Sequence, residues 1–502
     1  MIKPAIPLLL ACALAGCQAA SDAPAPASSA GRSWGSIQFQ PCTLSSNSGG
    51  AANVSAQCAS FEVAEDRGNA GGRRIQLALA WLPASEEAAA TADPVVFFAG
   101  GPGQSALRTW PALDPAFAQV RRQRHVLLVD QRGTGGSNLL QCLPPEQVHS
   151  SGELARDMEA VAALAARCAE DAARHADPRF YTTTDAVADL EEVRQALGVD
   201  QFNLVGVSYG TRMAQQYAAA HPRYVRSLVL DGVAPNDLVV GGEFARTFEE
   251  ALALQSQQCQ QSAQCTQRFP VDARSRLGEL VQRLKAAPVQ VEYRDPATAE
   301  LRTTTVSADT VTGVAFMFSY LPQTAALLPL VLDEAVQGRY EPLASLYQLM
   351  GRSVGDSMAR GMQWSVVCAE DADRVDGSGA DAGTLLGPEL ARMFFAACSA
   401  WPHGQRPEGF TAPLRSDIPA LLLSGELDPV TPPRFGEQVL QGLGKGRHLV
   451  LKGQGHGNLG SGCMPRLLAQ FVEAADAQAL DTACLDGLSH VPPFIHFNGW
   501  EP

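Results

Sequence analysis

Short runs of β-branched and aromatic residues alternate with helical patterns along most of this chain, and this alternation is its most restrictive feature. Apolar runs of this length, bounded by turn residues, are typical of parallel strands that are buried on both faces. Between two of them, residues 184–197 place apolar side chains on one helical face, and Gly198 follows as a helix terminator. The pattern predicts an α/β fold, in which helices cover both faces of a mostly parallel sheet. The runs are Val95–Phe98, His125–Val129, Phe202–Val207, Ser227–Leu230, Ala420–Leu423 and Arg447–Leu451.

The strand signals largely vanish over residues 236–414. Residues 311–336 and 343–350 have helical patterns instead. We therefore expect a mainly helical cap over residues 236–414, which splits the core into a first part at residues 34–235 and a C-terminal part at residues 415–502.

Composition supports a large folded core and argues against a nucleic-acid partner. With 502 residues, of which 46% are hydrophobic and 18% charged, the chain is too long for a small module and too apolar for a disordered one. We expect one large domain with an insertion, or two domains. The 52 acidic residues outnumber the 38 basic ones, and the net charge of −14 offers no electrostatic basis for binding a polyanion.

The start of the chain has the layout of an export signal. Lys3 precedes an apolar stretch over residues 6–14, which is far shorter than the ~20 residues that a membrane-spanning helix needs. We therefore expect a signal peptide over residues 1–16 and no membrane span. Cleavage near Ala20, where small residues also gather, is the alternative.

The segment Leu14-Ala15-Gly16-Cys17 resembles a bacterial lipobox. Cleavage before the cysteine of such a segment would leave Cys17 as a lipid-bearing N-terminus, and residues 17–33, rich in Ala, Pro and Ser, would form a linker. Gln18 follows the cysteine, as in lipoproteins that are sent to the outer membrane. We expect a periplasmic lipoprotein that touches the outer membrane only through this lipid.

The cysteine count supports export independently. Of the 12 cysteines, ten remain after Cys12 in the signal and Cys17 are set aside, and ten is an even number. No CxxC pair is present and no histidine lies near two cysteines at ligand spacing, so we expect no zinc site, no other metal and no cofactor. The sequence leaves the disulfide connectivity open. Pairing of sequence neighbours would give local loops at 42–58, 142–168, 259–265, 368–398 and 463–484, a pattern suited to an oxidising compartment.

A strand that runs directly into GxSxG carries the clearest chemical signal. The expected strand ends in Gly-Val-Ser-Tyr-Gly at residues 206–210, and residues 211–220 continue as a helix. This is the context of a nucleophile elbow, whose tight turn leaves no room for side chains at the flanking glycines. Residues 351–355 also match GxSxG, but a helical pattern precedes them instead of a strand. We therefore assign the nucleophile to Ser208 and not to Ser353.

A serine nucleophile needs a base and an orienting carboxylate, which this kind of fold supplies downstream in the order Ser, Asp, His. Asp428 lies in the loop after the expected strand at residues 420–423, and His456 lies in the loop after residues 447–451. We expect Asp428 and His456 to complete a catalytic triad. Asp231 also ends a strand and is the alternative acid.

Two backbone N–H groups are expected to stabilise the oxyanion of the reaction. One belongs to Tyr209, directly after the nucleophile. The other is expected in the loop Ala99-Gly100-Gly101-Pro102-Gly103, where Gly101 or its neighbour Gly100 can approach a substrate carbonyl. A plain tight turn is one alternative for these glycines. A phosphate-binding loop is another, but the sequence has no GxxxxGK[ST].

Taken in order, these motifs resemble the prolyl aminopeptidase and tripeptidyl aminopeptidase branch of the α/β-hydrolases. The resemblance spans about residues 34–484, and it implies an α/β-hydrolase fold with a cap and cleavage of peptides near a free N-terminus. It also implies a structural role for the acid and the arginine of the segment at residues 130–137. Ala99 departs from the branch, which often has His or Asn there. The segments that carry the resemblance are Ala99–Gly103, Asp130–Ser137, Gly206–Gly210, Gly425–Pro432 and Gly455–Gly457.

The cap sequence Trp364-Ser-Val-Val-Cys-Ala-Glu-Asp371 resembles a family segment in which a cysteine precedes an acidic residue. The resemblance implies that cap carboxylates hold the ammonium group of the substrate. We hypothesise that Glu370, together with Asp371, provides this anchor. A solvated acidic turn is the alternative.

The sequence thus predicts an exported serine aminopeptidase whose substrates are peptides or small amides or esters. One alternative is a non-peptidase hydrolase of esters, lactones or small amides with the same triad. The other is a binding lipoprotein on a scaffold that has lost its activity, and the presence of Ser208, Asp428 and His456 together argues against it. The sequence gives no indication of an oligomeric state.

Overall fold

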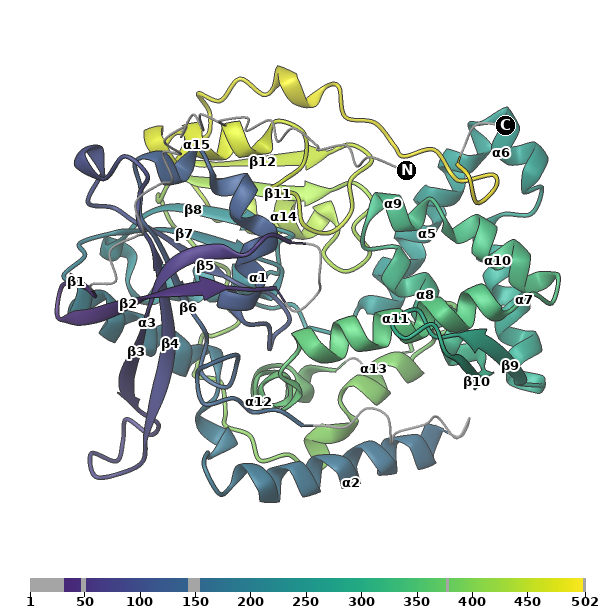
Figure 1. Ribbon diagram of the computed structural model, residues 1–502, viewed down its shortest axis with the longest axis horizontal. Coiled ribbons are helices and arrows are strands. Elements are labelled where there is room, and N and C mark those ends of the chain that lie inside the picture. The colour runs from purple at the N-terminus through teal and green to yellow at the C-terminus, as the bar shows by residue number, and fades with distance from the viewer. Residues whose placement is uncertain (1–30, 47–50, 143–153, 376–378, 500–502) are drawn as a thin grey trace, which may run out of the picture.

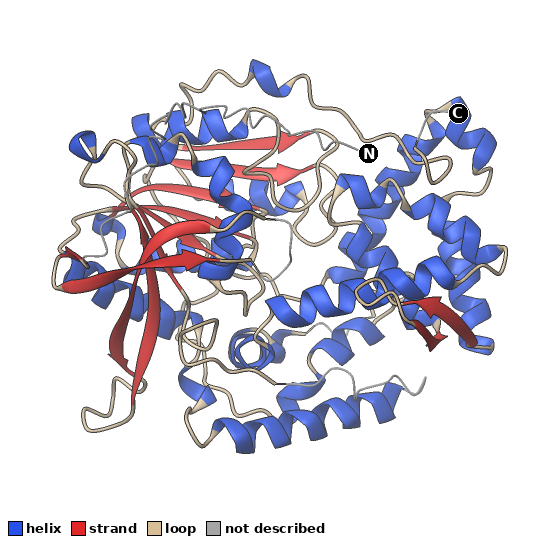
Figure 2. Cartoon of the chain, in the orientation of Figure 1, coloured by secondary structure: helices blue, strands red, loops and turns tan. Residues whose placement is uncertain are grey.

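A computed structural model describes residues 31–46, 51–142, 154–375 and 379–499 of the chain. A large sheet flanked by helices forms one side of the molecule, and a mostly helical part lies beside it (Figure 1). The distribution of strands and helices between the two parts is clear in Figure 2. The expected signal peptide, Cys17 and most of the expected linker lie outside the described residues.

The described sheet has ten strands in the order β1-β2-β3-β4-β6-β5-β7-β8-β11-β12. The half from β6 to β12 is parallel throughout. Each of the six apolar runs of the sequence is a strand of this half, so that prediction is confirmed. The strands are β1 (Arg32–Trp34), β2 (Ile37–Leu44), β3 (Val54–Ala64), β4 (Arg74–Leu82), β5 (Val95–Phe98), β6 (Val126–Val129), β7 (Phe202–Val207), β8 (Val225–Asp231), β11 (Ala420–Gly425) and β12 (Gly446–Leu451).

The other half of the sheet, β1 to β4, is antiparallel and was not predicted. The side chains of β2 alternate between buried and exposed over its first residues, as expected of a strand with one solvated face. The central strand β5, in contrast, is buried at every position. A strand that is buried at every position, such as β5, carries a continuous apolar run in the sequence.

Helices cover both faces of the sheet, as predicted. On one face α3 (Thr183–Leu197), α4 (Tyr209–Ala220) and α14 (Pro433–Leu440) contribute to one large apolar core. On the other face α1 (Ala106–Leu113) and α15 (Met464–Ala474) pack into a second core. The carboxyl ends of the parallel strands are thus held between two packed layers, and this fixes the loops that follow them.

The cap is built mainly of helices around an apolar core of its own. The cap also contains a two-stranded antiparallel hairpin, which the sequence did not predict. Helix α2 (Leu154–Ala172) belongs to the first part of the chain but packs against the cap residues Ala396–Ser399. The cap elements are α5 (Phe244–Gln260), α6 (Ala263–Arg268), α7 (Ala273–Ala286), β9 (Val289–Arg294), β10 (Leu301–Val306), α8 (Ala308–Phe318), α9 (Pro322–Ala325), α10 (Leu328–Val336), α11 (Glu341–Ser357), α12 (Arg360–Glu370) and α13 (Glu389–Phe394).

The C-terminal segment returns from the core to the cap, where Figure 1 shows it in yellow beside α6. The N–H of Phe494 donates to the carbonyl of Ala326 at 2.8 Å. Phe494 also packs against a cluster formed by Cys265, Phe269 and Leu330. The expected C-terminal core part, residues 415–502, therefore includes residues that lie on the cap.

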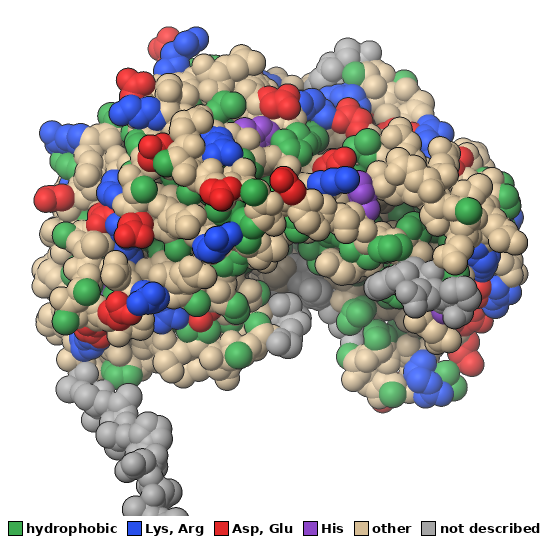
Figure 3. Space-filling model, turned by 90° about the horizontal axis from the view of Figure 1, so that it is seen from above, with side chains coloured by type: hydrophobic (Ala, Val, Ile, Leu, Met, Phe, Trp, Pro, Cys, Tyr) green, Lys and Arg blue, Asp and Glu red, His purple; other side chains and the backbone are tan. Residues whose placement is uncertain are grey.

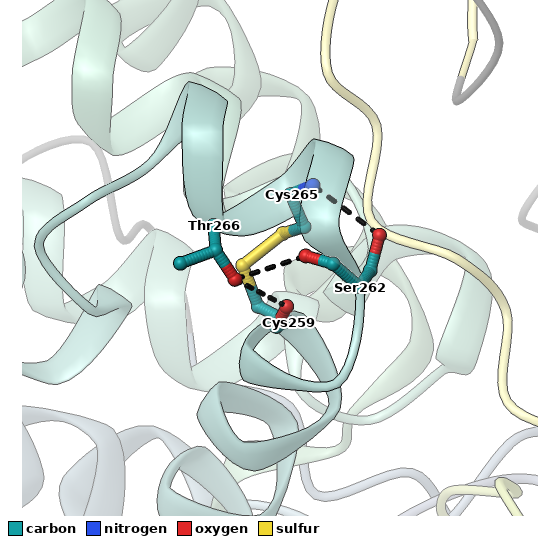
Figure 4. Close-up of a disulfide and its surroundings, with 4 residues drawn as sticks. All are labelled: Cys259, Ser262, Cys265 and Thr266. Carbon is teal, nitrogen blue, oxygen red and sulfur yellow. Dashed lines mark hydrogen bonds between the residues drawn. A yellow bond between two sulfur atoms is a disulfide. The ribbon is translucent and has the colours of Figure 1, made fainter.

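Five disulfides join the ten cysteines in the pairs that sequence neighbours would form, so this pairing is confirmed. Figure 4 shows the Cys259–Cys265 bond between α5 and α6. The hydroxyl of Ser262 accepts the N–H of Cys265 at 3.2 Å and thereby caps α6. The hydroxyl of Thr266 donates to the carbonyl of Ser262 at 2.9 Å. The closed turn orders the part of the cap on which the C-terminal segment packs.

Within the described ranges, no helix is both long enough and apolar enough to cross a membrane. The same part of the chain contains no cluster of three or more His, Cys, Asp or Glu side chains arranged to hold a metal ion. Acidic and basic side chains are interspersed on the face shown in Figure 3, which gives that face no large patch of a single charge.

Candidate active site

Ser208 occupies the sharp turn between β7 and α4, as expected for a nucleophile elbow. Its φ is 58° and its ψ is −126°, a conformation that a residue with a side chain rarely adopts. Three hydrogen bonds hold it there. The N–H of Ser208 donates to the carbonyl of Asp231 at 2.8 Å, and the N–H and hydroxyl of Thr211 donate to the carbonyl of Ser208 at 2.9 and 2.7 Å.

The glycines beside Ser208 are required by close backbone contacts. A Cβ atom on Gly206 would lie 2.3 Å from the carbonyl oxygen of Gly210. A Cβ atom on Gly210 would lie 2.3 Å from the carbonyl oxygen of Phe98 at the end of β5. Both distances are far below van der Waals contact, so any larger residue would push the helix away from the strand.

Asp428 and His456 meet at the ends of β11 and β12. The Nδ1–H of His456 donates to Oδ2 of Asp428 at 2.7 Å. The other oxygen, Oδ1, accepts the N–H groups of Val430 and Thr431 at 2.9 and 2.8 Å. Burial would raise the pKa of Asp428, but the His456 ring and these N–H groups lower it below its usual value. Asp428 is therefore held as an oriented carboxylate.

The ring of His456 lies beside the end of β8, the strand that pairs with β7, which leads to Ser208. With Nδ1 bonded to Asp428, Nε2 is left as the acceptor. A Cβ on Gly232, the residue after Asp231, would lie 3.0 Å from Cε1 of His456. Burial would lower the pKa of His456, but the carboxylates of Asp428 and Asp231 outweigh it and raise this pKa.

Asp231, the alternative acid, has a different task. Its carboxylate is fully buried and accepts the N–H groups of Asn458 and Leu459 at 2.5 and 2.9 Å. Burial raises the pKa of Asp231 to about 6. These contacts tie the loop that follows His456 to the end of β8, while Asp428 is the hydrogen-bond partner of the imidazole.

The expected oxyanion loop lies directly against Ser208. A Cβ atom on Gly100 would be 3.0 Å from Cβ of Ser208, so the backbone of this loop faces the serine. Gly101 has a φ of 110°, which favours glycine. The N–H of Tyr209 is the first of α4 and therefore has no acceptor within the helix. The structure thus brings Gly100 against Ser208, next to Gly101 in the same loop, while Tyr209 follows Ser208 directly in the chain.

The structure does not present Glu370 and Asp371 as an open anionic site, and the hypothesis that they anchor the substrate amine needs correction. Both side chains are fully buried. Asp371 pairs with Arg212 of α4 at 3.0 Å and with Arg374 at 2.6 Å. Glu370 accepts the N–H and hydroxyl of Thr183 at 2.7 and 3.0 Å. With all four oxygens engaged inside the protein, these carboxylates fasten α12 to α3 and α4.

This cluster reaches the elbow through hydroxyl groups. The hydroxyl of Thr183 lies 2.5 Å from the phenol oxygen of Tyr209, which also accepts Nε2 of Gln131 at 3.1 Å. Burial raises the pKa of Glu370 to about 7. The carboxyl group of Glu370 is thus two hydrogen bonds away from Tyr209, the residue that follows Ser208.

The segment at residues 130–137 is structural, as the resemblance implied. Asp130 accepts the hydroxyl of Ser105 at 2.6 Å and the N–H of Leu107 at 3.0 Å at the start of α1. The fully buried guanidinium of Arg132 forms two hydrogen bonds to Asp189, at 2.7 and 2.6 Å. These contacts lock the loops around the strand ends.

Sequence reasoning missed three residues beside the site. The hydroxyl of Thr431 donates to Oδ2 of Asp428 at 2.9 Å and lies 3.0 Å from Nδ1 of His456. In the cap, the backbone carbonyl of Tyr320 accepts the backbone N–H of His456 at 2.7 Å. Sδ of Met358, also in the cap, would lie 3.1 Å from a Cβ on Gly101 of the oxyanion loop. The position of Thr431 three residues after the acid could have indicated its role. No local signal identifies the two cap residues.

Comparison with known protein families agrees with this geometry. Residues 93–290, which include Ser208, match the family model described as alpha/beta hydrolase fold. Residues 384–484, which include Asp428 and His456, match the family model described as TAP-like protein.

Similar proteins include several named peptidases. Serine protease Hip1 of Mycobacterium tuberculosis is 25% identical over 452 residues, which are 84% of this chain and 85% of Hip1. Tripeptidyl aminopeptidase of Streptomyces lividans is 28% identical over 189 residues, or 35% of each protein. YuaR of Escherichia coli (strain K12), which is named as a hydrolase and not as a peptidase, is 30% identical over 166 residues, so the chain matches about a third of its length.

Proposed function

Because parts of the chain match the alpha/beta hydrolase and TAP-like family models, and similar proteins include named peptidases, we propose that it is an exported serine aminopeptidase of the α/β-hydrolases. It releases residues or short peptides from the free N-termini of peptides by way of an acyl-enzyme on Ser208. The observation that carries the proposal is the buried hydrogen bond between His456 and Asp428 at the strand ends next to the Ser208 elbow.

In this mechanism the hydroxyl of Ser208 attacks the scissile carbonyl while Nε2 of His456 takes its proton. Asp428 holds the ring and stabilises the imidazolium that forms. The N–H groups of Tyr209 and of Gly101 or Gly100 stabilise the oxyanion. The imidazolium then gives its proton to the leaving amine as the C–N bond breaks, and a water molecule activated by His456 hydrolyses the ester.

The position of the cap supports action on chain ends. The N–H of Ala359 donates to the carbonyl of Gly103 in the oxyanion loop at 2.9 Å, and Tyr320 accepts the N–H of His456. The cap thus touches the site on both sides of Ser208. A covered site admits the end of a chain more readily than its middle, in line with the name of the tripeptidyl aminopeptidase relative.

The five disulfides support export, because such bonds persist in oxidising compartments. The lipid on Cys17 and attachment to the outer membrane are part of the proposal. Fractionation of cells that produce the wild type or Cys17→Ser tests them. The wild type is expected in the outer-membrane fraction and the variant in a soluble or unprocessed form, whereas equal distribution of the two would contradict the anchor.

Activity profiling tests the reaction itself. The purified protein is offered aminoacyl, X-Pro and tripeptidyl amides, each with a free or an acetylated N-terminus, and acyl esters in parallel. We expect cleavage of amides with a free N-terminus that Ser208→Ala abolishes. Cleavage of esters alone would indicate a non-peptidase hydrolase, and Ser208-independent or absent turnover would overturn the proposed mechanism.

A further inference from the structure

Arg360, the first residue of α12, is a partly buried cation without an anionic partner among the described residues. One hydrogen bond of its guanidinium is found, from Nη1 to Oε1 of Gln363 at 2.5 Å. Two other arginines near this helix, in contrast, have carboxylate partners. Arg374 pairs with Asp371 at 2.6 Å, and Arg406 pairs with Asp373 at 2.6 Å. Burial lowers the pKa of Arg360, and no nearby carboxylate offsets it. A partly buried charge without a counter-ion is unfavourable to the folded protein, and a bound anion would offset this cost.

The backbone around Arg360 places it beside the oxyanion loop. Met358 forms an isolated antiparallel bridge with Gln104, and Sδ of Met358 would lie 3.1 Å from a Cβ on Gly101. The next residue, Ala359, donates its N–H to the carbonyl of Gly103. Arg360 is therefore anchored one residue beyond the contact between the cap and the loop that faces Ser208.

Helical periodicity gives the direction of the side chain. Arg360, Gln363, Val367 and Glu370 are spaced by three, four and three residues and so share one face of α12. Glu370 at the far end of this face contacts Thr183, whose hydroxyl touches Tyr209 next to the nucleophile. The Glu370 end of this face is therefore turned toward the elbow, and Arg360 begins the same face directly after Ala359, whose N–H contacts the oxyanion loop.

We propose that Arg360 binds a carboxylate of the substrate, and that the site selects peptides with an anionic group close to the scissile bond. This inference rests on the proposed peptidase function and adds a substrate class to it. A guanidinium has five N–H donors in a planar fork that matches a carboxylate, and Gln363 accepts one of them. The carboxylate is either the C-terminus of a short peptide or an acidic side chain.

Matched substrate pairs distinguish these two sources. One pair is a short peptide with a free or an amidated C-terminus, and the other contains Glu or Gln beside the scissile bond. For at least one pair, wild-type kcat/KM is expected to be at least about tenfold higher for the anionic member, as for a charge-assisted hydrogen bond in a shielded site. In Arg360→Gln the ratio is expected to fall to about one, and Arg360→Lys is expected to retain part of it. Arg392→Gln, which removes an exposed arginine from α13, is the control and should keep the wild-type ratio.

Binding to the Ser208→Ala protein measures the same preference without turnover. The Kd of the anionic peptide is expected to be at least about tenfold lower than that of its neutral partner, and the added Arg360→Gln change should remove this difference. Ratios near one in the wild type, or a preference that survives in Arg360→Gln, would overturn the assignment of Arg360. If either of these results is found while Ser208-dependent cleavage is intact, only the role of Arg360 is contradicted and the peptidase function still holds. If peptides are not cleaved but the Kd still favours the anionic peptide, only the peptidase function is contradicted.

Discussion

Replacement of Asp428 by asparagine tests how the base is held. In the wild type the imidazolium that forms during the reaction lies against a buried carboxylate, with Nδ1 2.7 Å from Oδ2. Opposite unit charges about 4 Å apart attract each other by about 4 kcal/mol at an effective dielectric constant of about 20, which corresponds to about a thousandfold in rate. An amide that turns its NH₂ group toward Nδ1 also favours the wrong imidazole tautomer. We expect kcat/KM of Asp428→Asn to fall by a factor of about 10³ to 10⁴.

The pH profile gives the same variant a second readout. Asp428 raises the pKa of His456 in the wild type, and kcat/KM of a reaction that needs the neutral ring increases as pH rises through this pKa. In Asp428→Asn this limb of the profile should move to lower pH. The assay is hydrolysis of a chromogenic amide with a free N-terminus, with folding checked by circular dichroism. A loss of less than about tenfold, or an unshifted limb, would refute the reasoning.

Three further substitutions have distinct expected results. Thr431→Val removes a hydroxyl that donates to Asp428 and should lower kcat by about tenfold with little change in KM. Thr431→Ser keeps the hydroxyl and should keep the wild-type kcat, whereas an unchanged kcat in Thr431→Val would contradict this role. Gly210→Ala would place a methyl group 2.3 Å from the carbonyl oxygen of Phe98 and should lower Tm. Gly351→Ala is the control, because its methyl group would meet no atom within 4 Å, and it should not lower Tm. Equal Tm values for the two variants would show that the elbow can accommodate a side chain at residue 210. Burial raises the pKa of Glu370 from the ordinary 4.5 to about 7, so between these pH values the native protein keeps a proton that the unfolded chain releases. The free energy of unfolding should therefore fall as pH rises from 4.5 to about 7. Glu370→Gln should flatten this pH dependence in thermal unfolding, and a slope identical to that of the wild type would contradict the prediction.

The elements that could be predicted are those whose signal is local. The central strands are buried at nearly every position, and the elbow combines a strand, a tight turn and a helix within about 20 residues of sequence. Gly198 ends α3 with a φ of 67°, as its position indicated. The disulfides follow sequence neighbours because each closes a loop of 6 to 30 residues.

The parts that were missed depend on contacts between distant segments. Whether Glu370 faces solvent or protein is decided by Thr183 and Arg212, which lie more than 150 residues earlier in the chain. The return of Phe494 to the cap depends on an apolar cluster around Cys265 that forms only after the cap has folded. Strands β2 and β3 carry exposed side chains among the buried ones, and this is a weaker sequence pattern than a continuous apolar run.

Covalent labelling of the nucleophile tests the central claim most directly. The protein is treated with a fluorophosphonate that carries a free amine, and the modified residue is located by mass spectrometry of its peptides. A single adduct is expected on Ser208, slowed at least about a thousandfold in His456→Ala and absent in Ser208→Ala. An unlabelled Ser208 in folded protein, or stoichiometric labelling of another serine with loss of activity, would contradict the account.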